Sequence, residues 1–148
     1  MLEKSSSLIF LNYLTSVFDR LGESILLIGV EPQETYRLLL ANDAFWQDTG
    51  HQRDQIGKSI EEIVDAESYG LLKRRYKKVI TSKRATEYTE WYTVPAGRQA
   101  YEVKLAPILN AVGECVQIAA ITRNVTELYN LRTQVQDLRR RLYTSKNH

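Results

Sequence analysis

The stretch that decides the fold is AYEVKLAPILNAVGECVQIAAIT, residues 100–122. In its first half, apolar and charged side chains alternate, which is the period of a strand with one buried face. The apolar members of this alternation are Tyr101, Val103 and Leu105. Residues 110–113, NAVG, have the composition of a turn, and residues 115–122, CVQIAAIT, are apolar enough for a central strand. The sequence therefore predicts two consecutive strands joined by a short turn.

Further strand signals lie on both sides of this pair. Residues 87–94 end at the turn sequence PAGR and predict a strand that precedes the one at 99–109. Near the other end of the chain, residues 24–30 (SILLIGV) and 35–41 (TYRLLLA) flank EPQE, which is a turn sequence. We therefore expect a hairpin early in the chain and three strands late in it.

Helical signals fill the space between the strands. Residues 42–64 predict short helices broken by glycine, one of them started by a capping box between Ser59 and Glu62. Residues 67–82 predict a longer helix, whose apolar residues Tyr69, Leu72, Tyr76 and Val79 step by three and four. This order of elements predicts an α+β fold, with a five-stranded antiparallel sheet and helices on one face.

Composition limits the classes of function. The length of 148 residues suits one domain. With 20 basic and 18 acidic residues the net charge is +2, which is too small to favour binding to nucleic acid or to a membrane surface. The longest strongly apolar run is far shorter than the roughly 20 residues of a membrane span. The single cysteine, Cys115, cannot form an internal disulfide, so we expect a reducing, cytoplasmic setting.

Short motifs add a resemblance over residues 22–130. They are NDAF at 42–45, TG at 49–50, IGKS at 56–59, YEV at 101–103 with PI at 107–108, and NVTE at 124–127. Together they resemble the N-x-A-F, T-G, I-G-K-S and closing D-I-T-E segments of the PAS superfamily of sensory domains. The sequence departs from the family pattern at Asn124, where Asp is usual, and in a slightly shorter segment between Gly50 and Gly57. Asn caps a helix about as well as Asp, and we expect Glu127 to complete a capping box.

The resemblance implies three parts of the chain. Residues 1–22 form a leading amphipathic helix, residues 23–124 the PAS domain, and residues 125–148 a coiled-coil signalling helix. Apolar residues spaced by three and four predict that both helices pair in a homodimer. These residues are Leu11, Leu14, Phe18 and Leu21 in the first helix, and Leu128, Leu131, Val135, Leu138 and Leu142 in the second.

A cavity between sheet and helices is the expected ligand site. Its predicted lining is Phe45, Ile60, Tyr69, Leu72, Tyr76, Trp91, Tyr101 and Val103. Each of these side chains alone suits ordinary core packing, and as a set they suit an apolar or aromatic ligand. The sequence leaves the identity of a cofactor unknown.

Two cofactor types familiar in relatives are disfavoured by the residues present. Haem-binding relatives usually carry a ligand on the long helix, which has no histidine here. His51, in a polar stretch, is expected at the surface. A flavin adduct needs a G-x-N-C-R-F type motif, which is missing, so Cys115 is interpreted as a packing residue.

Three functions stay open from the sequence. The first is an input module for an output domain or a partner signalling protein, as in two-component or cyclic-nucleotide signalling. The second is a PAS scaffold that binds no ligand and only dimerises or binds a partner. The third is a small α+β isomerase using Asp65 with Tyr69 or Tyr101. Because no catalytic motif accompanies those residues, a non-enzymatic sensory module is the leading prediction.

Overall fold

The computed structural model describes the backbone of residues 2–146, and it describes side chains at residue 9 and from residue 12 to residue 146. The strands are β1 (Ser24–Glu31), β2 (Thr35–Ala41), β3 (Thr86–Val94), β4 (Gly97–Leu109) and β5 (Cys115–Asn124). The α-helices are α1 (Leu2–Leu21), α2 (Asp43–Thr49), α3 (Ile60–Ile63), α4 (Ala66–Ser82) and α5 (Thr126–Lys146). Short 3-10 turns occupy η1 (Pro32–Glu34) and η2 (Arg53–Gln55). The predicted α+β order of elements is confirmed.

The strands form one antiparallel sheet in the order β2-β1-β5-β4-β3. The first and last strands of the sheet in sequence, β1 and β5, therefore meet at its centre. Register on β4 and β5 places Tyr101 opposite Asn124 and Leu105 opposite Ala120. Side chains opposite one another on neighbouring strands share a face, so Tyr101 and Asn124 project to the same side.

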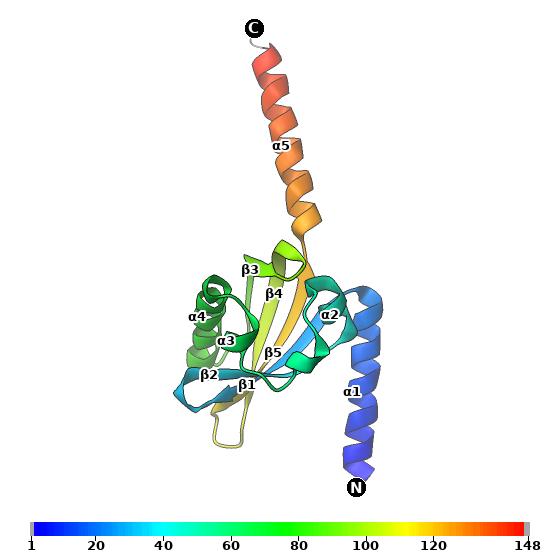
Figure 1. The fold of residues 1–148 in the computed structure, drawn as a ribbon, viewed down its shortest axis with the longest axis vertical. Helices are drawn as coiled ribbons and strands as arrows, with labels where there is room; N and C mark the ends of the chain where they lie inside the picture. Colours follow the sequence, from blue (N-terminus) through cyan, green and yellow to red (C-terminus); the bar gives the residue numbers. More distant parts are fainter. Residues whose placement is uncertain (1, 147–148) are drawn as a thin grey trace.

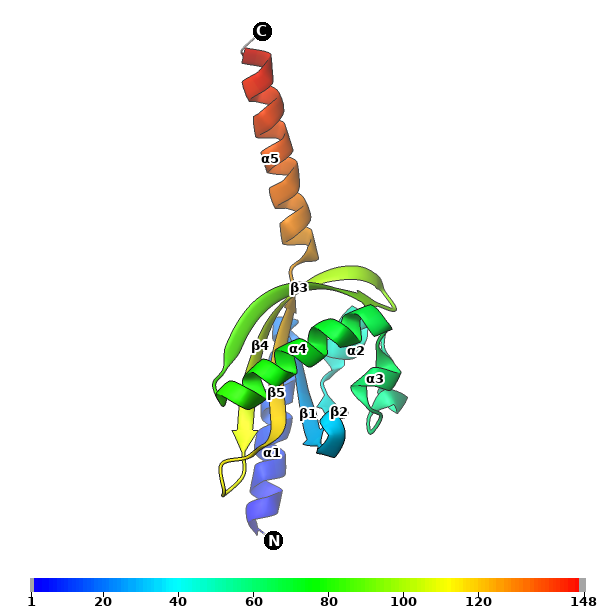
Figure 2. The same ribbon diagram turned by 90° about the vertical axis from the view of Figure 1, so that its left-hand side faces the viewer.

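The helices α2, α3 and α4 cover the inner face of the sheet, and α4 crosses it diagonally (Figure 2). The alternation predicted for β4 is realised, because Tyr101, Val103 and Leu105 are buried while Lys104 is exposed. Leu38 from β2 and Val79 from α4 are among the most deeply buried side chains beneath these helices. The core therefore lies between the inner face of the sheet and these helices.

Asn42 and Gly50, at the two ends of α2, determine the path of the backbone there. The Asn42 side chain accepts hydrogen bonds from the amides of Phe45 (3.3 Å) and Ile25 (2.9 Å), and donates to the Glu23 carbonyl at 2.9 Å. At the other end Gly50 adopts the left-handed conformation, with φ 80°, that glycine tolerates best. A Cβ at this position would also lie 3.2 Å from the Ala96 backbone nitrogen. The turn after α2 is thus closely specified, and it sets the direction of the residue that follows.

The terminal helices project away from the domain at opposite ends (Figure 1). The helix α1 contacts β1 and α2, and the Asp19 carboxylate accepts a 2.9 Å hydrogen bond from the Ala44 amide at the start of α2. The helix α5 contacts β4 at its base and continues beyond the sheet. None of the helices within residues 2–146 has the length and apolar character needed to cross a bilayer.

Candidate functional site

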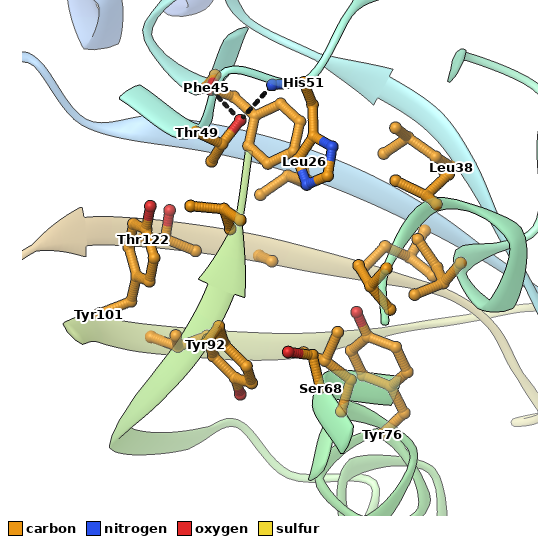
Figure 3. Close-up of a pocket in the computed structure, with 18 of the residues that line it drawn as sticks. Leu26, Leu38, Phe45, Thr49, His51, Ser68, Tyr76, Tyr92, Tyr101 and Thr122 are labelled. Carbon is orange, nitrogen blue, oxygen red and sulfur yellow. Dashed lines mark hydrogen bonds between the residues drawn. The ribbon is translucent and has the colours of Figure 1, made fainter. Parts of the chain in front are cut away.

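A cavity of about 100 Å³ lies between the inner face of the sheet and the helices α2, α3 and α4 (Figure 3). Its walls are almost wholly apolar, with aliphatic side chains from β1, β2, β4 and β5 and aromatic rings from α2, α4, β3 and β4. A concave, mostly apolar space with a few polar groups is the usual form of a small-molecule site. Its volume is well below the roughly 300 Å³ at which sites for larger ligands begin.

The structure brings six of the eight predicted lining residues to this cavity. They are Phe45 from α2, Ile60 from α3, Leu72 and Tyr76 from α4, and Tyr101 and Val103 from β4. Their shared position follows from the two periods already described, since α4 presents every fourth residue and β4 every second.

The predictions for Trp91 and Tyr69 as lining residues are wrong. On β3 the buried residues are Tyr88 and Tyr92, so Trp91 projects from the opposite face of the sheet. There the ring of Trp91 packs against the ring of Tyr129 on α5, with the two centroids 6.3 Å apart. On α4 the lining residues include Ser68 and Leu72, and Tyr69 is turned about 100° from Ser68 by the helical period. Tyr69 instead lines a separate polar hollow beside Tyr36.

Sequence reasoning missed two tyrosines of the cavity wall, Tyr88 and Tyr92. The Tyr92 hydroxyl donates a 3.0 Å hydrogen bond to the Tyr88 hydroxyl, which pairs both polar ends within the core. The signal that could have found them is their spacing of four along a predicted strand, which puts them on one face.

The expectation that His51 lies at the surface is also wrong, because its exposed fraction is only 8%. Its imidazole lines the cavity and stacks on the Phe45 ring, with centroids 5.7 Å apart and planes 15° from parallel (Figure 3). The Thr49 hydroxyl accepts from the His51 amide at 3.2 Å and donates to the Phe45 carbonyl at 2.7 Å. The Gly50 turn directs the side chain inward, and the polar neighbours in the sequence conceal this.

Burial makes His51 a titrating group with a predictable effect on stability. Desolvation lowers its pKa below the usual 6.5, although a contact with Gln55 opposes part of the shift. As the pH falls through about 6.5, His51 is therefore protonated in the unfolded chain while it is still neutral in the folded chain. We expect the free energy of unfolding to fall as the pH drops from about 6.5 to the lowered pKa, and to level off below it.

Urea unfolding of the wild type and of His51→Gln at pH 7.5, 6.5 and 5.5 measures this effect. The wild type should lose stability relative to the variant across this range, at a slope of at most about 1.4 kcal/mol per pH unit for one proton. Parallel pH profiles for the two proteins would show that His51 is freely protonated in the folded state.

A cluster of polar side chains joins the cavity wall to the start of α5. Its members are Asp48 at the end of α2, Gln99 and Tyr101 on β4, Asn124 at the end of β5, and Thr126, the first residue of α5. The Asn124 amide donates to Asp48 Oδ1 at 2.9 Å and to Gln99 Oε1 at 3.0 Å. Its carbonyl oxygen accepts from the Thr126 amide at 3.0 Å and from the Thr126 hydroxyl at 2.6 Å.

Asn124 thus supports the start of the helix, but differently from the predicted capping box. The helix α5 begins at Thr126, so Glu127 is its second residue and not its third. The Asn124 side chain bonds to the amide two residues ahead. Asn also provides what Asp could not, because only an amide can donate to the Asp48 carboxylate.

Comparison with known proteins shows which family has this fold. A family model described as the PAS fold matches residues 18–130, which is most of the chain. The chain belongs to the PAS family. As a PAS domain it is, in general terms, a sensory or signalling module, and its sheet and helices are those of that fold. No curated protein matched the sequence.

Several solved structures share the fold at low identity. An RNA-binding light-oxygen-voltage receptor is 19% identical with a TM-score of 0.65, over 96% of this chain and 40% of that one. The PAS domain of a Colwellia psychrerythraea protein is 14% identical with a TM-score of 0.64, over 80% of this chain and 98% of that one. The PAS domain of the fruit-fly ELK potassium channel is 19% identical with a TM-score of 0.54, over 79% of this chain and 98% of that one. This PAS domain spans less than half the length of the RNA-binding receptor.

The remaining candidate groups of the PAS domain lie away from the cavity. Cys115 is half-buried at the start of β5 and is not a lining residue. Asp65 is exposed, precedes α4 and is also not a lining residue. Among the described residues, no group of three His, Cys, Asp or Glu side chains could hold a metal ion.

Proposed function

We propose that this PAS domain is the input module of a signal-transduction protein. A compact ligand in the cavity changes the hydrogen bonds at the start of α5. The two α5 helices of a homodimer then pass the change to an output domain or to a partner protein. One cysteine and a small net charge suit a cytoplasmic module that binds neither nucleic acid nor lipid.

The observation that carries this proposal is the exposed apolar stripe of α5. Its side chains are exposed by 41% to 63% although all are leucine or valine. They are Leu128, Leu131, Val135, Leu138 and Leu142. Their alternate spacing of three and four is that of a two-stranded coiled coil, in which a second copy of the helix covers the stripe.

The leading helix α1 supports the same dimer. Leu14, Val17 and Leu21 are exposed by 38%, 51% and 66%. Phe18 is half-buried at the end of α1 that meets the domain, and the side chain of Leu11 lies outside the described residues. The predicted pairing of α1 remains a prediction, and its exposed leucines make it a second surface for the partner copy.

The polar cluster supports a route from cavity to helix. Tyr101 lines the cavity, Asp48 lies near its hydroxyl, and Asn124 links Asp48 to Thr126 at the first turn of α5. A ligand that changes the arrangement of Tyr101 and Asp48 therefore affects the hydrogen bonds from Asp48 through Asn124 to the start of α5. Such a ligand shifts the module between two states only by binding them with different affinity.

Asn124→Asp tests this route. The new carboxylate cannot donate, so it faces Asp48 Oδ1 and Gln99 Oε1 with no hydrogen between them. Asn124 is half-buried, so we expect a loss of about 1 kcal/mol in the free energy of unfolding, at the lower end of the cost of an unpaired buried polar group. Hydrogen exchange should also accelerate in the first turn of α5.

Asn130→Asp is the matched control, because Asn130 is exposed on α5 and the chemical change is the same. It should alter stability by no more than about 0.5 kcal/mol, as exposed substitutions do. If Asn124→Asp behaves like this control in both stability and exchange, the cluster does not hold the helix start.

A second candidate, a PAS scaffold that binds no ligand, is favoured by the small volume of the cavity. Native mass spectrometry of the purified protein separates the two functions. Added mass on the folded chain supports sensing, whereas the mass of the bare chain and its dimer supports a scaffold. We also propose that the module is not an enzyme, since the Asp65 carboxylate that an isomerase would need does not line the cavity.

A further inference from the structure

The cavity has walls suited to one small ring and is slightly smaller than such a ring needs. A cavity of about 150 Å³ with aliphatic and aromatic walls holds benzene in another protein, and this one has about 100 Å³. Aromatic rings from four elements face it, among them Phe45, Tyr76, Tyr92 and Tyr101 (Figure 3). Rings in such surroundings pack edge to face or offset against a bound ring. A compact aromatic molecule would therefore suit these walls, and a slight widening of the cavity would admit it.

One part of the wall is polar and incompletely paired. The Tyr101 hydroxyl and Asp48 Oδ2 are both buried without a hydrogen-bond partner, and the exposed fraction of Tyr101 is 4%. The carboxylate is near enough to raise the pKa of Tyr101 beyond the effect of burial, so the hydroxyl keeps its proton. Buried polar atoms are seldom left unpaired, which makes this corner a place for a polar group of a ligand.

The chemistry of the two groups decides which kind of polar group fits. No hydrogen bond joins the two groups in the structure, but a carboxylate can only accept hydrogen bonds, so the nearby Asp48 favours an orientation in which the Tyr101 hydroxyl points its one proton toward it. The hydroxyl oxygen then has only lone pairs to offer. A ligand group beside it must therefore donate.

From these features we infer that the cavity binds a single-ring aromatic ligand carrying a hydrogen-bond donor, such as a phenolic O–H or an anilinic N–H, which the Tyr101 hydroxyl accepts. This assignment deepens the proposed sensory function by naming the class of ligand. It also gives Tyr101 two roles, because the residue that accepts the ligand's hydrogen bond also lies near Asp48, which Asn124 links to the start of α5.

Phenol and toluene are the matched probes, because a hydroxyl replaces a methyl group on the same ring. Burying a hydroxyl without a partner costs free energy, so an apolar cavity prefers toluene. With Tyr101 as the acceptor, phenol should bind at least as tightly as toluene. Dissociation constants are measured by NMR titration of the full chain, and shifts of the Leu26 and Leu105 methyl groups show that each probe is in the cavity.

Tyr101→Phe should raise the phenol dissociation constant about tenfold, which corresponds to 1.4 kcal/mol, and change that of toluene less than twofold. Tyr69→Phe removes the same atom outside this cavity and should change neither. Asp48→Asn is a second variant that leaves the lining intact. Its amide can donate to Tyr101 and compete with phenol, so the phenol dissociation constant should rise while that of toluene stays.

Three results would overturn the assignment: toluene binding tenfold tighter than phenol, equal effects of Tyr101→Phe on both probes, or no shift of the cavity methyl groups with either. These readouts do not depend on oligomeric state. A chain that binds phenol as predicted but stays monomeric would contradict the proposed dimeric signalling and leave the ligand assignment standing.

Discussion

Replacing Leu131 and Leu138 of α5 with Glu is expected to convert the proposed dimer into monomers. Burying one leucine side chain contributes about 1.5 kcal/mol or more, and the double substitution removes four such side chains from one interface. The loss of about 6 kcal/mol raises the dissociation constant by more than four orders of magnitude. Sedimentation equilibrium over a range of concentrations measures this change.

The control adds the same charges to the polar face of the same helix. Thr133→Glu with Gln136→Glu places two carboxylates at exposed positions outside the apolar stripe. This variant should stay as dimeric as the wild type. Intact dimers of the Leu131 and Leu138 variant, at concentrations where the control is dimeric, would show that another surface forms the interface.

Leu105→Ala should lower the free energy of unfolding by about 3 kcal/mol, within the 2–5 kcal/mol range for buried leucine truncations. Leu105 is 1% exposed, lies on β4 beside the central strand and lines the cavity. The space left by its missing atoms adds to an existing cavity, so the walls have little to collapse onto. Urea unfolding at a fixed protein concentration measures the loss, because the proposed dimerisation would make stability depend on concentration.

Leu109→Ala supplies the comparison on the same strand. Leu109 is 42% exposed near the turn that joins β4 to β5, so its truncation should cost less than about 1 kcal/mol. Similar losses at the two positions would mean that Leu105 is not packed in a rigid core. An unchanged denaturant slope in Leu105→Ala is needed to read the difference as stability.

Much of the fold could be predicted because its signals are local. The alternation on β4, the hairpin sequences and the capping box between Ser59 and Glu62 each depend on residues a few positions apart. The structure shows that capping box, with the Ser59 amide donating to Glu62 Oε2 at 3.1 Å. The strand order was less direct, since β1 pairs with β5 across most of the chain. The sequence analysis predicted the number of strands and their antiparallel arrangement, but not their order in the sheet.

The candidate site was predicted only in part, because it depends on the direction in which each side chain points and on contacts between residues far apart in the sequence. Trp91 was misplaced because two aromatic residues, Trp91 and Tyr92, are adjacent in sequence and the period alone does not say which one faces inward. His51 was misplaced because a single glycine turn directs it inward. Asp48 gave no signal, since its partner Asn124 is 76 residues away.

The functional account depends on α5 lying beside its own copy in a parallel pair. A spin label attached at Ser145→Cys, in a Cys115→Ser background, allows pulsed electron paramagnetic resonance to measure the distance between the ends of the two helices. A parallel pair has helix axes about 8–10 Å apart, so we predict label separations of roughly 20 Å or less. An antiparallel pair would separate the labels by about the 30 Å length of the helix. Separations of about 30 Å or more, or no dipolar coupling in a sample known to be dimeric, would contradict the account.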